Sequence, residues 1–160
     1  MDFERSIATY ALDVDDLASF SCCGEDPSPW ELEAENYIRA FALRHAAFVL
    51  AFRDKSGRLA AVSAFDPREI HVPLNAPTPE PGWHIQVLAL SKGLHNAGHS
   101  REIFTQTFDA MRTIAPERVL VTAHAHKEHA ISLTACGRVG LTPLVPLDAH
   151  YWVLLGEVPE

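Results

Sequence analysis

The hydrophobic residues of the chain fall into short blocks separated by turn residues. Apolar blocks of four to eight residues, rich in β-branched and aromatic side chains, predict strands. The turn segment DKSG at residues 54–57 lies between two such blocks and predicts a β-hairpin. The expected strands cover residues 5–13, 46–53, 58–65, 83–90, 118–124, 141–146 and 150–158.

Other segments have helical spacing. Residues 28–45 begin with a capping serine, Ser28, a proline at the first helical position and Glu31, which completes a capping box. The expected apolar face of this helix comprises Trp30, Ala34, Tyr37, Ile38 and Phe41. Residues 100–114 predict an amphipathic helix, residues 129–139 a shorter one that ends near Gly140, and residues 14–20 a short helix.

Between the hairpin and the next strand, residues 66–82 contain five prolines and predict a long irregular connection, with a short extended piece at residues 68–72. A loop of this length in a compact domain often forms one wall of a site. Strands and helices mix along the chain, and 160 residues suit one domain. We therefore expect a single α/β domain over residues 1–160.

Composition narrows the class of protein. The chain is 48% hydrophobic and has a net charge of −8, which disfavours a broad nucleic-acid surface and makes a nucleic-acid partner an unfavoured expectation. It has no apolar stretch of membrane-spanning length, and its first residues lack the pattern of a signal peptide. Cys22 and Cys23 are adjacent and Cys136 is distant, so free thiols are expected. These features predict a cytoplasmic protein without a membrane partner.

The segment IQVLALSKGLHNAGHSREIF, residues 85–104, predicts a buried strand, a glycine-bearing turn and an amphipathic helix. The first amides of a helix have no internal partners and form an anion site. Gly98 would let the backbone approach a phosphate, and Ser100 could cap the helix or contact the ligand. From this segment alone, an ordinary strand-to-helix turn is as well supported as a phosphate site.

The order of elements and this turn resemble those of the GNAT N-acetyltransferases. That superfamily carries Q/R-x-x-G-x-G/A after its fourth strand, around the pyrophosphate of acetyl-CoA. Here HNAGHS matches, with His95 at the Gln/Arg position, Gly98 at the first glycine and Ser100 at the second, so two of the three signature positions depart from the pattern. Residues 129–141 resemble the late helix of the family, and residues 19–43 resemble the early part of GNAT toxins that acetylate aminoacyl-tRNA.

The resemblance implies an α/β (α+β) fold with a mixed, mostly antiparallel central sheet of about seven strands flanked by helices. It also implies that acetyl-CoA, or another acyl-CoA, is the donor and lies between the splayed fourth and fifth strands, with no metal expected. The acyl-CoA site would comprise Leu88, Ala89, Leu90, His95, Asn96, Ala97, Gly98, His99 and Ser100.

Acyl transfer to an amine needs a polarised carbonyl, a base for the amine and an acid for the leaving thiolate. His84 and His126 are the candidate bases, because an imidazole titrates near neutrality. Gln86 and His124 share strand faces with them and are expected to contact the amine. The family often uses a tyrosine acid on the late helix; the matching position here is Cys136, whose thiol has a reference pKa of ~8.5.

The segment HAHKEH, residues 124–129, suggests a different class of protein. Its spacing matches the H-x-H-x-D-H zinc motif of the metallo-β-lactamase family, with Glu128 in the aspartate position. Only 31 residues follow His129, and His150 with Asp148 offers few further ligands. A zinc hydrolase is therefore the less favoured hypothesis.

We thus predict an acyl-CoA-dependent N-acyltransferase with a small-molecule or peptide amine as substrate. The first alternative is a GNAT-like module that binds CoA or a protein without turnover. The apolar segments at residues 141–146 and 150–156 could pair in a homodimer.

Overall fold

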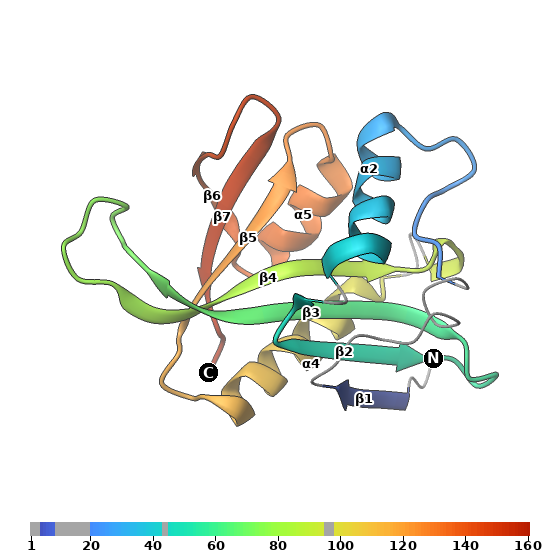
Figure 1. Cartoon of the computed structure of the whole chain (residues 1–160), viewed down its shortest axis with the longest axis horizontal. Coiled ribbons are helices and arrows are strands. Elements are labelled where there is room, and N and C mark those ends of the chain that lie inside the picture. Colours follow the sequence, from blue (N-terminus) through green and yellow to red (C-terminus); the bar gives the residue numbers. More distant parts are fainter. Residues whose placement is uncertain (1–3, 9–19, 43–44, 95–97) are drawn as a thin grey trace. The chain divides into compact units, whose positions relative to one another are not determined.

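The structure is a computed structural model that describes residues 4–8, 20–42, 45–94 and 98–160. Its seven strands have the order β1-β2-β3-β4-β5-β7-β6 (Figure 1). β4 and β5 are parallel, whereas the pairs β1–β2, β2–β3, β5–β7 and β6–β7 are antiparallel. The predicted mixed, mostly antiparallel sheet is confirmed. The short helix expected at residues 14–20 falls mainly outside the described residues.

The chain forms two compact units, residues 1–65 with 86–103 and residues 66–85 with 104–160. The long strands β3 (Leu59–Ile70) and β4 (Glu80–Leu90) contribute residues to both. The expectation that residues 1–160 make a single domain stays a prediction.

The first unit is built on the hairpin that the DKSG turn predicted. β2 (Phe48–Arg53) pairs with β3 on one side and with β1 (Glu4–Ala8) on the other. Among its described residues, this unit contains the helix α2 (Pro29–Tyr37), the π-helix η1 (Ile38–Ala42) and the 3-10 helix η2 (Lys92–Leu94). Its core cluster consists of Phe20, Ile38, Ala46, Val49, Ala51, Leu59, Val62 and Ala64.

The capping box at the start of α2 is present, as predicted: the Ser28 N–H donates to Glu31 Oε2 at 2.7 Å. The predicted apolar face is wrong in part, because Ala34 is exposed and Tyr37 is 42% exposed. The buried residue of α2 is instead Glu35, whose Oε1 accepts a hydrogen bond from a backbone N–H thirteen residues earlier. A partner so far away in sequence overrides the local periodicity.

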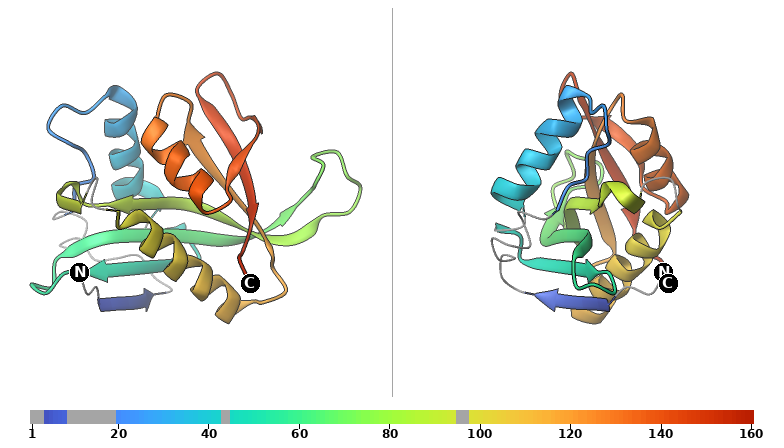
Figure 2. Two further views of the ribbon diagram at one scale, coloured as in Figure 1. Left: turned by 180° about the vertical axis from the view of Figure 1, so that it is seen from behind. Right: turned by 90° about the vertical axis from the view of Figure 1, so that its right-hand side faces the viewer.

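The second unit contains most of α4 (Ser100–Ile114), with β5 (Leu120–His126), α5 (Ala130–Arg138), β6 (Thr142–Pro146) and β7 (Tyr151–Glu157). α5 packs against β5 and β6 (Figure 2). It ends before Gly140, whose φ of +86° is the left-handed conformation that favours glycine after a helix. The predicted bounds of α4 and α5 agree with the structure to within one residue.

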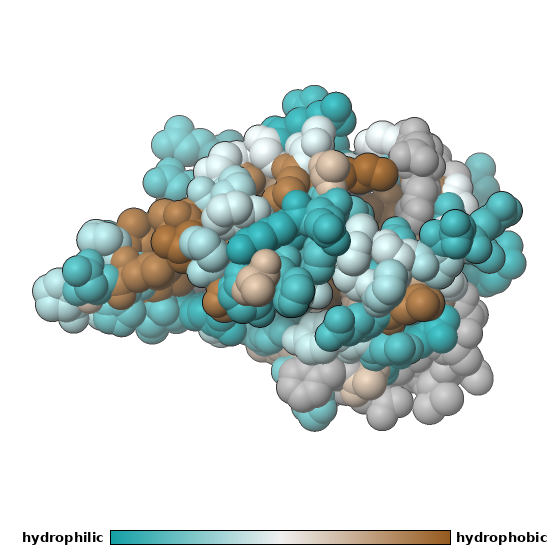
Figure 3. All heavy atoms as spheres, turned by 90° about the horizontal axis from the view of Figure 1, so that it is seen from above, coloured by the Kyte–Doolittle hydropathy of each residue, from teal (hydrophilic) through white to brown (hydrophobic). Residues whose placement is uncertain are grey.

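The irregular connection predicted for residues 66–82 is shorter than expected. β3 continues through Pro67 to Ile70, and β4 already begins at Glu80, which leaves residues 71–79 as the loop. Proline removes one donor but does not prevent an extended backbone, so a strand can include it where no ladder bond is lost. Val72 and Leu74 are exposed in this loop, and hydrophobic surface is visible near it (Figure 3).

Within the described residues, no helix combines the length and apolar character needed to cross a membrane.

Replacing Gly156 by alanine is expected to destabilise the second unit. Gly156 lies on β7 opposite Val121, and a Cβ atom there would be 2.6 Å from the Gly140 carbonyl oxygen. Because backbone must move to relieve this contact, we expect Gly156→Ala to lower the free energy of unfolding by about 1–3 kcal/mol. Urea titration followed by circular dichroism measures it.

The matched control is Gly137→Ala in α5, where an added Cβ meets nothing within 4 Å. Alanine is the better helix former, so this variant should keep or raise the stability, by up to about 1 kcal/mol. Equal stability of the two variants would contradict the close contact at Gly156.

Candidate functional site

The carboxyl end of β4 presents the residues predicted to hold the donor. Val87 and Ala89 pack against the core cluster of the first unit. Because side chains alternate along a strand, Gln86, Leu88 and Leu90 face the opposite side, as the sequence predicted. All of these residues are half-buried. The pairing of β4 with β5 runs from Gly82 to Ile85, so these residues lie beyond it.

The turn after β4 leads through η2 to α4. Gly98 has a φ of +76°, and a Cβ placed there meets nothing within 4 Å. Glycine is thus required by the backbone conformation and not by crowding, which leaves open space beside the turn. His95, Asn96 and Ala97 of the predicted motif lie outside the described residues.

Ser100 is the first residue of α4 and not its cap. The residue before it, His99, accepts the Ile103 N–H at 3.2 Å through its backbone carbonyl. The expectation that Ser100 caps the helix is therefore wrong by one residue, because His99 occupies the capping position. Its hydroxyl still lies in the first turn, where helix amides point outward and favour an anion.

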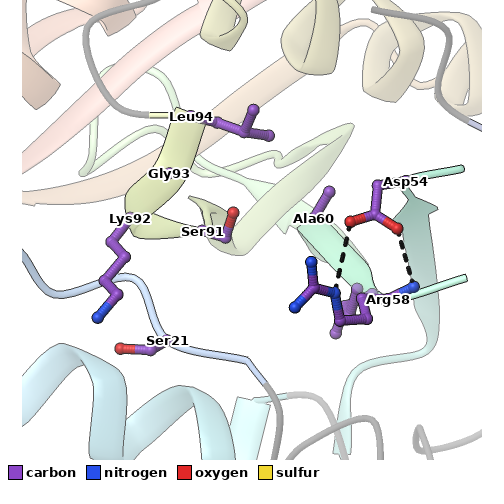
Figure 4. Close-up of a pocket in the computed structure, with 9 residues that line it drawn as sticks. Ser21, Asp54, Arg58, Ala60, Ser91, Lys92, Gly93 and Leu94 are labelled. Carbon is purple, nitrogen blue, oxygen red and sulfur yellow. Dashed lines mark hydrogen bonds and ion pairs between the residues drawn. The ribbon is translucent and has the colours of Figure 1, made fainter. Parts of the chain in front are cut away.

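A cavity of about 310 Å³ lies in the first unit beside η2 (Figure 4). Its buried lining includes Leu59 and Ala60. Arg58 at its edge lies 3.8 Å from Asp54 (Nε to Oδ2), while Lys92 extends toward Ser21. Sequence reasoning missed this cavity. The one available signal was two cationic residues near the ends of neighbouring strands.

Tyr37 of α2 also lies near β4, which the sequence did not indicate. Its hydroxyl donates to Gln86 Oε1 at 2.9 Å. The residues are 49 positions apart, so no local pattern could have paired them. Gln86, predicted to contact the amine, therefore has a tyrosine as its neighbour.

His84 lies on β4 in the second unit and is only 5% exposed. Its Nδ1 shares a hydrogen bond of 2.9 Å with Thr122 Oγ1 of β5. Burial, with the nearby positive charge of Arg68, lowers the pKa of His84 to about 3. The imidazole is thus neutral and weakly basic at pH 7, which does not suit the base role predicted for it.

His124 is on the exposed side of β5, and its ring meets that of His84 edge-on at 4.7 Å between centroids. Partial burial of the ring and the charge of Arg68 lower the pKa of His124. The two imidazoles are therefore in contact across β4 and β5, an arrangement that the sequence did not predict.

His126, the other predicted base, lies at the end of β5 and is half-buried. Its Nδ1 accepts the Glu128 N–H at 3.2 Å, which assigns the ring proton to Nε2 in the neutral form. Tyr151 meets the ring edge-on at 5.0 Å, and His150 stacks on it at 6.1 Å. Tyr151 at the start of β7 and the preceding His150 thus pack against this imidazole.

The zinc hypothesis for HAHKEH is not supported by this geometry. In the part of the chain that the structure describes, His124, His126 and His129 do not bring their ring nitrogens together as a metal would require. The bond from Glu128 N–H occupies Nδ1 of His126, and the chain turns before α5 begins. The histidines have the spacing of a zinc motif in the sequence, but their ring nitrogens do not come close enough together to coordinate one ion.

Cys136, the predicted acid, is on α5 and is 7% exposed. Burial raises the pKa of its thiol to about 11. The thiol is therefore protonated at neutral pH, as an acid must be, but little of its surface is accessible.

No protein-family model matches the chain, and no curated protein is similar to it in sequence. Solved structures do match. A mutant of the toxin AtaT, bound to acetyl-CoA and to the C-terminus of the antitoxin AtaR, has 15% identity and a TM-score of 0.70; the match covers 99% of this chain and 94% of that one.

Two others extend the comparison. A protein from Desulfovibrio desulfuricans, described as an acetyltransferase of the GNAT family, has 14% identity and a TM-score of 0.67 over 98% of this chain and 100% of that one. The complex of KacTA with DNA has 17% identity and a TM-score of 0.64 over 97% and 94% of the two chains. Identities this low establish the architecture alone. The chain has the GNAT fold.

Proposed function

We propose that the protein is an acyl-CoA-dependent N-acyltransferase that moves an acetyl or similar acyl group directly to a primary amine. The observation that carries the proposal is the left-handed Gly98 at the turn from β4 into α4, within a GNAT fold. The backbone there can approach a diphosphate, and the first amides of α4 supply donors. The acetyl-CoA bound to the AtaT mutant is consistent with the same donor class.

The donor would contact residues 88–90 and 95–100. Backbone amides near Leu88 and Leu90 would hold the pantetheine and polarise the thioester carbonyl. Lys92 and Arg58 would place positive charge near the phosphates, although Arg58 is already partly neutralised by Asp54. The role of His95, Asn96 and Ala97 rests on the sequence resemblance.

For the acceptor, we assign the base to His126 in place of His84. His126 is half-buried, and the Glu128 N–H bond to Nδ1 places the proton of the neutral ring on Nε2. To act as the base through Nε2, the ring would first change tautomer: its proton would move to Nδ1, the Glu128 bond would break, and Nε2 would then take the amine proton. His84 would stay neutral and hydrogen-bonded to Thr122, without taking the proton. Gln86 and His124 would position the amine.

In this scheme the amine nitrogen attacks the thioester carbonyl, the C–S bond breaks, and the leaving thiolate takes a proton. Cys136 is the candidate donor of that proton, because its raised pKa keeps the thiol protonated. The family often has a tyrosine at this point. Its replacement by a buried thiol favours slow chemistry.

The alternative is a GNAT-like module that binds CoA or a protein without turnover. The buried position of Cys136 and the departures at His95 and Ser100 favour it. Transfer to any amine would exclude this alternative, whereas donor binding with no transfer across a broad amine panel would support it.

Neighbouring structures were solved with an antitoxin segment or with DNA. For this chain we propose a protein partner before a nucleic acid, because a net charge of −8 repels phosphates. A homodimer through the last two strands remains part of the proposal.

Replacing Gly98 by glutamine should abolish acetyl-CoA binding. The side chain would enter the open space beside the turn, and a left-handed φ costs a non-glycine residue on the order of 1–3 kcal/mol. Isothermal titration calorimetry with acetyl-CoA measures the effect. Gly140→Gln is the control, because Gly140 has a similar φ of +86° in the second unit.

The control should lose stability and retain donor affinity. Undiminished affinity in a folded Gly98→Gln protein would remove the turn from the donor site. A wild-type protein that does not bind acetyl-CoA would overturn the proposed function.

Replacing His126 by glutamine should lower the rate of transfer by about 10²–10⁴-fold without weakening acetyl-CoA binding, because a general base acts on the chemical step. The readout is release of the CoA thiol with a panel of primary amines. His45→Gln changes an exposed histidine in the first unit and should leave the rate unchanged. Equal rates for wild type and His126→Gln would exclude His126 as the base.

His84 should stay neutral down to about pH 3, which NMR of its ring protons can follow. Its folded pKa of about 3 is below the unfolded value of 6.5, so the unfolded state binds the extra proton between these limits. Stability should therefore fall as the pH drops from 6.5 toward 3, by about 1.4 kcal/mol per pH unit from this group.

The variant His84→Asn should lose this part of the pH dependence, whereas His45→Gln should keep it. A His84 ring that titrates near pH 6.5 in the folded protein would show that the residue is accessible, and would restore it as a candidate base.

A further inference from the structure

A cluster in the first unit has no part in the proposed transfer. Cys22 and Cys23 precede α2, and Glu35 is on α2. One potential ligand atom from each of the three lies within 4.8 Å of the others. Cys23 and Glu35 are buried and Cys22 is half-buried. The three groups are therefore held by packing and are not mobile side chains on the surface. Sequence reasoning assigned only free thiols here.

The segment before α2 is fixed to the helix at several points. The Cys22 N–H donates to Glu35 Oε1 at 2.9 Å, and Cys23 Sγ donates to the Glu31 carbonyl oxygen at 3.4 Å. Arg39 donates to the Phe20 carbonyl through Nη2 at 2.6 Å and through Nε at 3.2 Å. The three groups are therefore held together before any ligand arrives, which lowers the entropy lost on binding.

In this cluster the carboxylate of Glu35 is ionised, whereas the thiol of Cys22 is protonated. Burial alone would raise the pKa of Glu35, but hydrogen bonds from Ser21 and the Cys22 N–H bring it below its ordinary value, so the carboxylate is ionised. Arg39 Nη2 is 3.7 Å from Glu35 Oε1 and is partly exposed. Burial, Cys23 and the Glu35 charge raise the pKa of Cys22 to about 12. A cation at this point would stabilise all three ligands in their ionised forms.

We propose that Cys22, Cys23 and Glu35 form a zinc-binding site, with two thiolates and one carboxylate as protein ligands. Zn²⁺ accepts sulfur at about 2.3 Å and carboxylate oxygen at about 2.0–2.2 Å. Thiolates at that distance on a tetrahedral ion are about 3.8 Å apart, so atoms that lie within 4.8 Å of one another need to approach by at most about 1 Å. Small side-chain rotations supply this. Water would take the fourth position.

The protons and charges balance. Binding of one Zn²⁺ displaces the two thiol protons to solvent, because only thiolates ligate the metal. Two thiolates, one carboxylate and Zn²⁺ then leave one negative charge, facing Arg39. No oxidant or reductant takes part. The site ties the segment before α2 to the helix and is separate from the proposed transfer, since neither α5 nor the histidines of β5 contribute to it.

The test uses Co²⁺ as a spectroscopic probe of the metal-stripped, reduced protein. Thiolate ligation gives a sulfur-to-cobalt charge-transfer band in the near ultraviolet. We expect the band to saturate at one Co²⁺ per chain and to disappear when Zn²⁺ is added. Cys22→Ser and Cys23→Ser should each lose it, whereas Cys136→Ser, which changes the third cysteine, should keep it.

Absence of the band in the wild-type protein, or its persistence in both Cys22→Ser and Cys23→Ser, overturns the proposal. If the variants fail to fold, the wild-type protein can be tested instead. It is alkylated with iodoacetamide, and the modified cysteines are mapped by mass spectrometry. Zn²⁺ should protect Cys22 and Cys23 at least tenfold and leave the rate at Cys136 unchanged. Equal rates with and without Zn²⁺ would also overturn it.

Discussion

A close backbone approach at Gly82 sets the register on which the second unit depends. A Cβ atom there would lie 2.7 Å from the Leu120 carbonyl oxygen and would collide with Ile70. Glycine permits the parallel pairing of Gly82 with Leu120, and this register brings His84 opposite Thr122. A slip of one residue would turn His84 to the other face of the sheet. The absence of a side chain at Gly82 thus permits the register in which His84 is buried opposite Thr122.

Local sequence features predicted the fold well where local interactions decide it. The capping box at Ser28, the DKSG hairpin and the amphipathic helix at residues 100–114 each depend on residues close in sequence. The burial of Glu35 depends on a backbone donor thirteen residues away, and the inclusion of Pro67 in β3 depends on which ladder bonds the strand needs. Neither can be read from periodicity.

In the candidate site, too, some features follow from local sequence and others depend on tertiary packing. Alternation along β4 correctly placed Gln86, Leu88 and Leu90 on one side, because that follows from strand geometry alone. Whether a histidine on the same strand is a base depends on its solvent exposure and its neighbours on β5. The hydrogen bond from Tyr37 to Gln86 joins residues 49 positions apart. Residue type and spacing therefore identified the strands of the site, and tertiary packing decided the chemistry of each group.

Burial, more than residue type, sorts the reactive side chains of this protein. His84 is neutral because desolvation disfavours its charged form, and the thiols of Cys22 and Cys136 are protonated for the same reason. Such groups are poor bases and nucleophiles, and for this reason we propose the less buried His126, in place of His84, as the base. A buried thiol becomes a strong ligand only when a cation offsets the desolvation. The pair beside the ionised Glu35 has the geometry for that, and the isolated Cys136 on α5 does not.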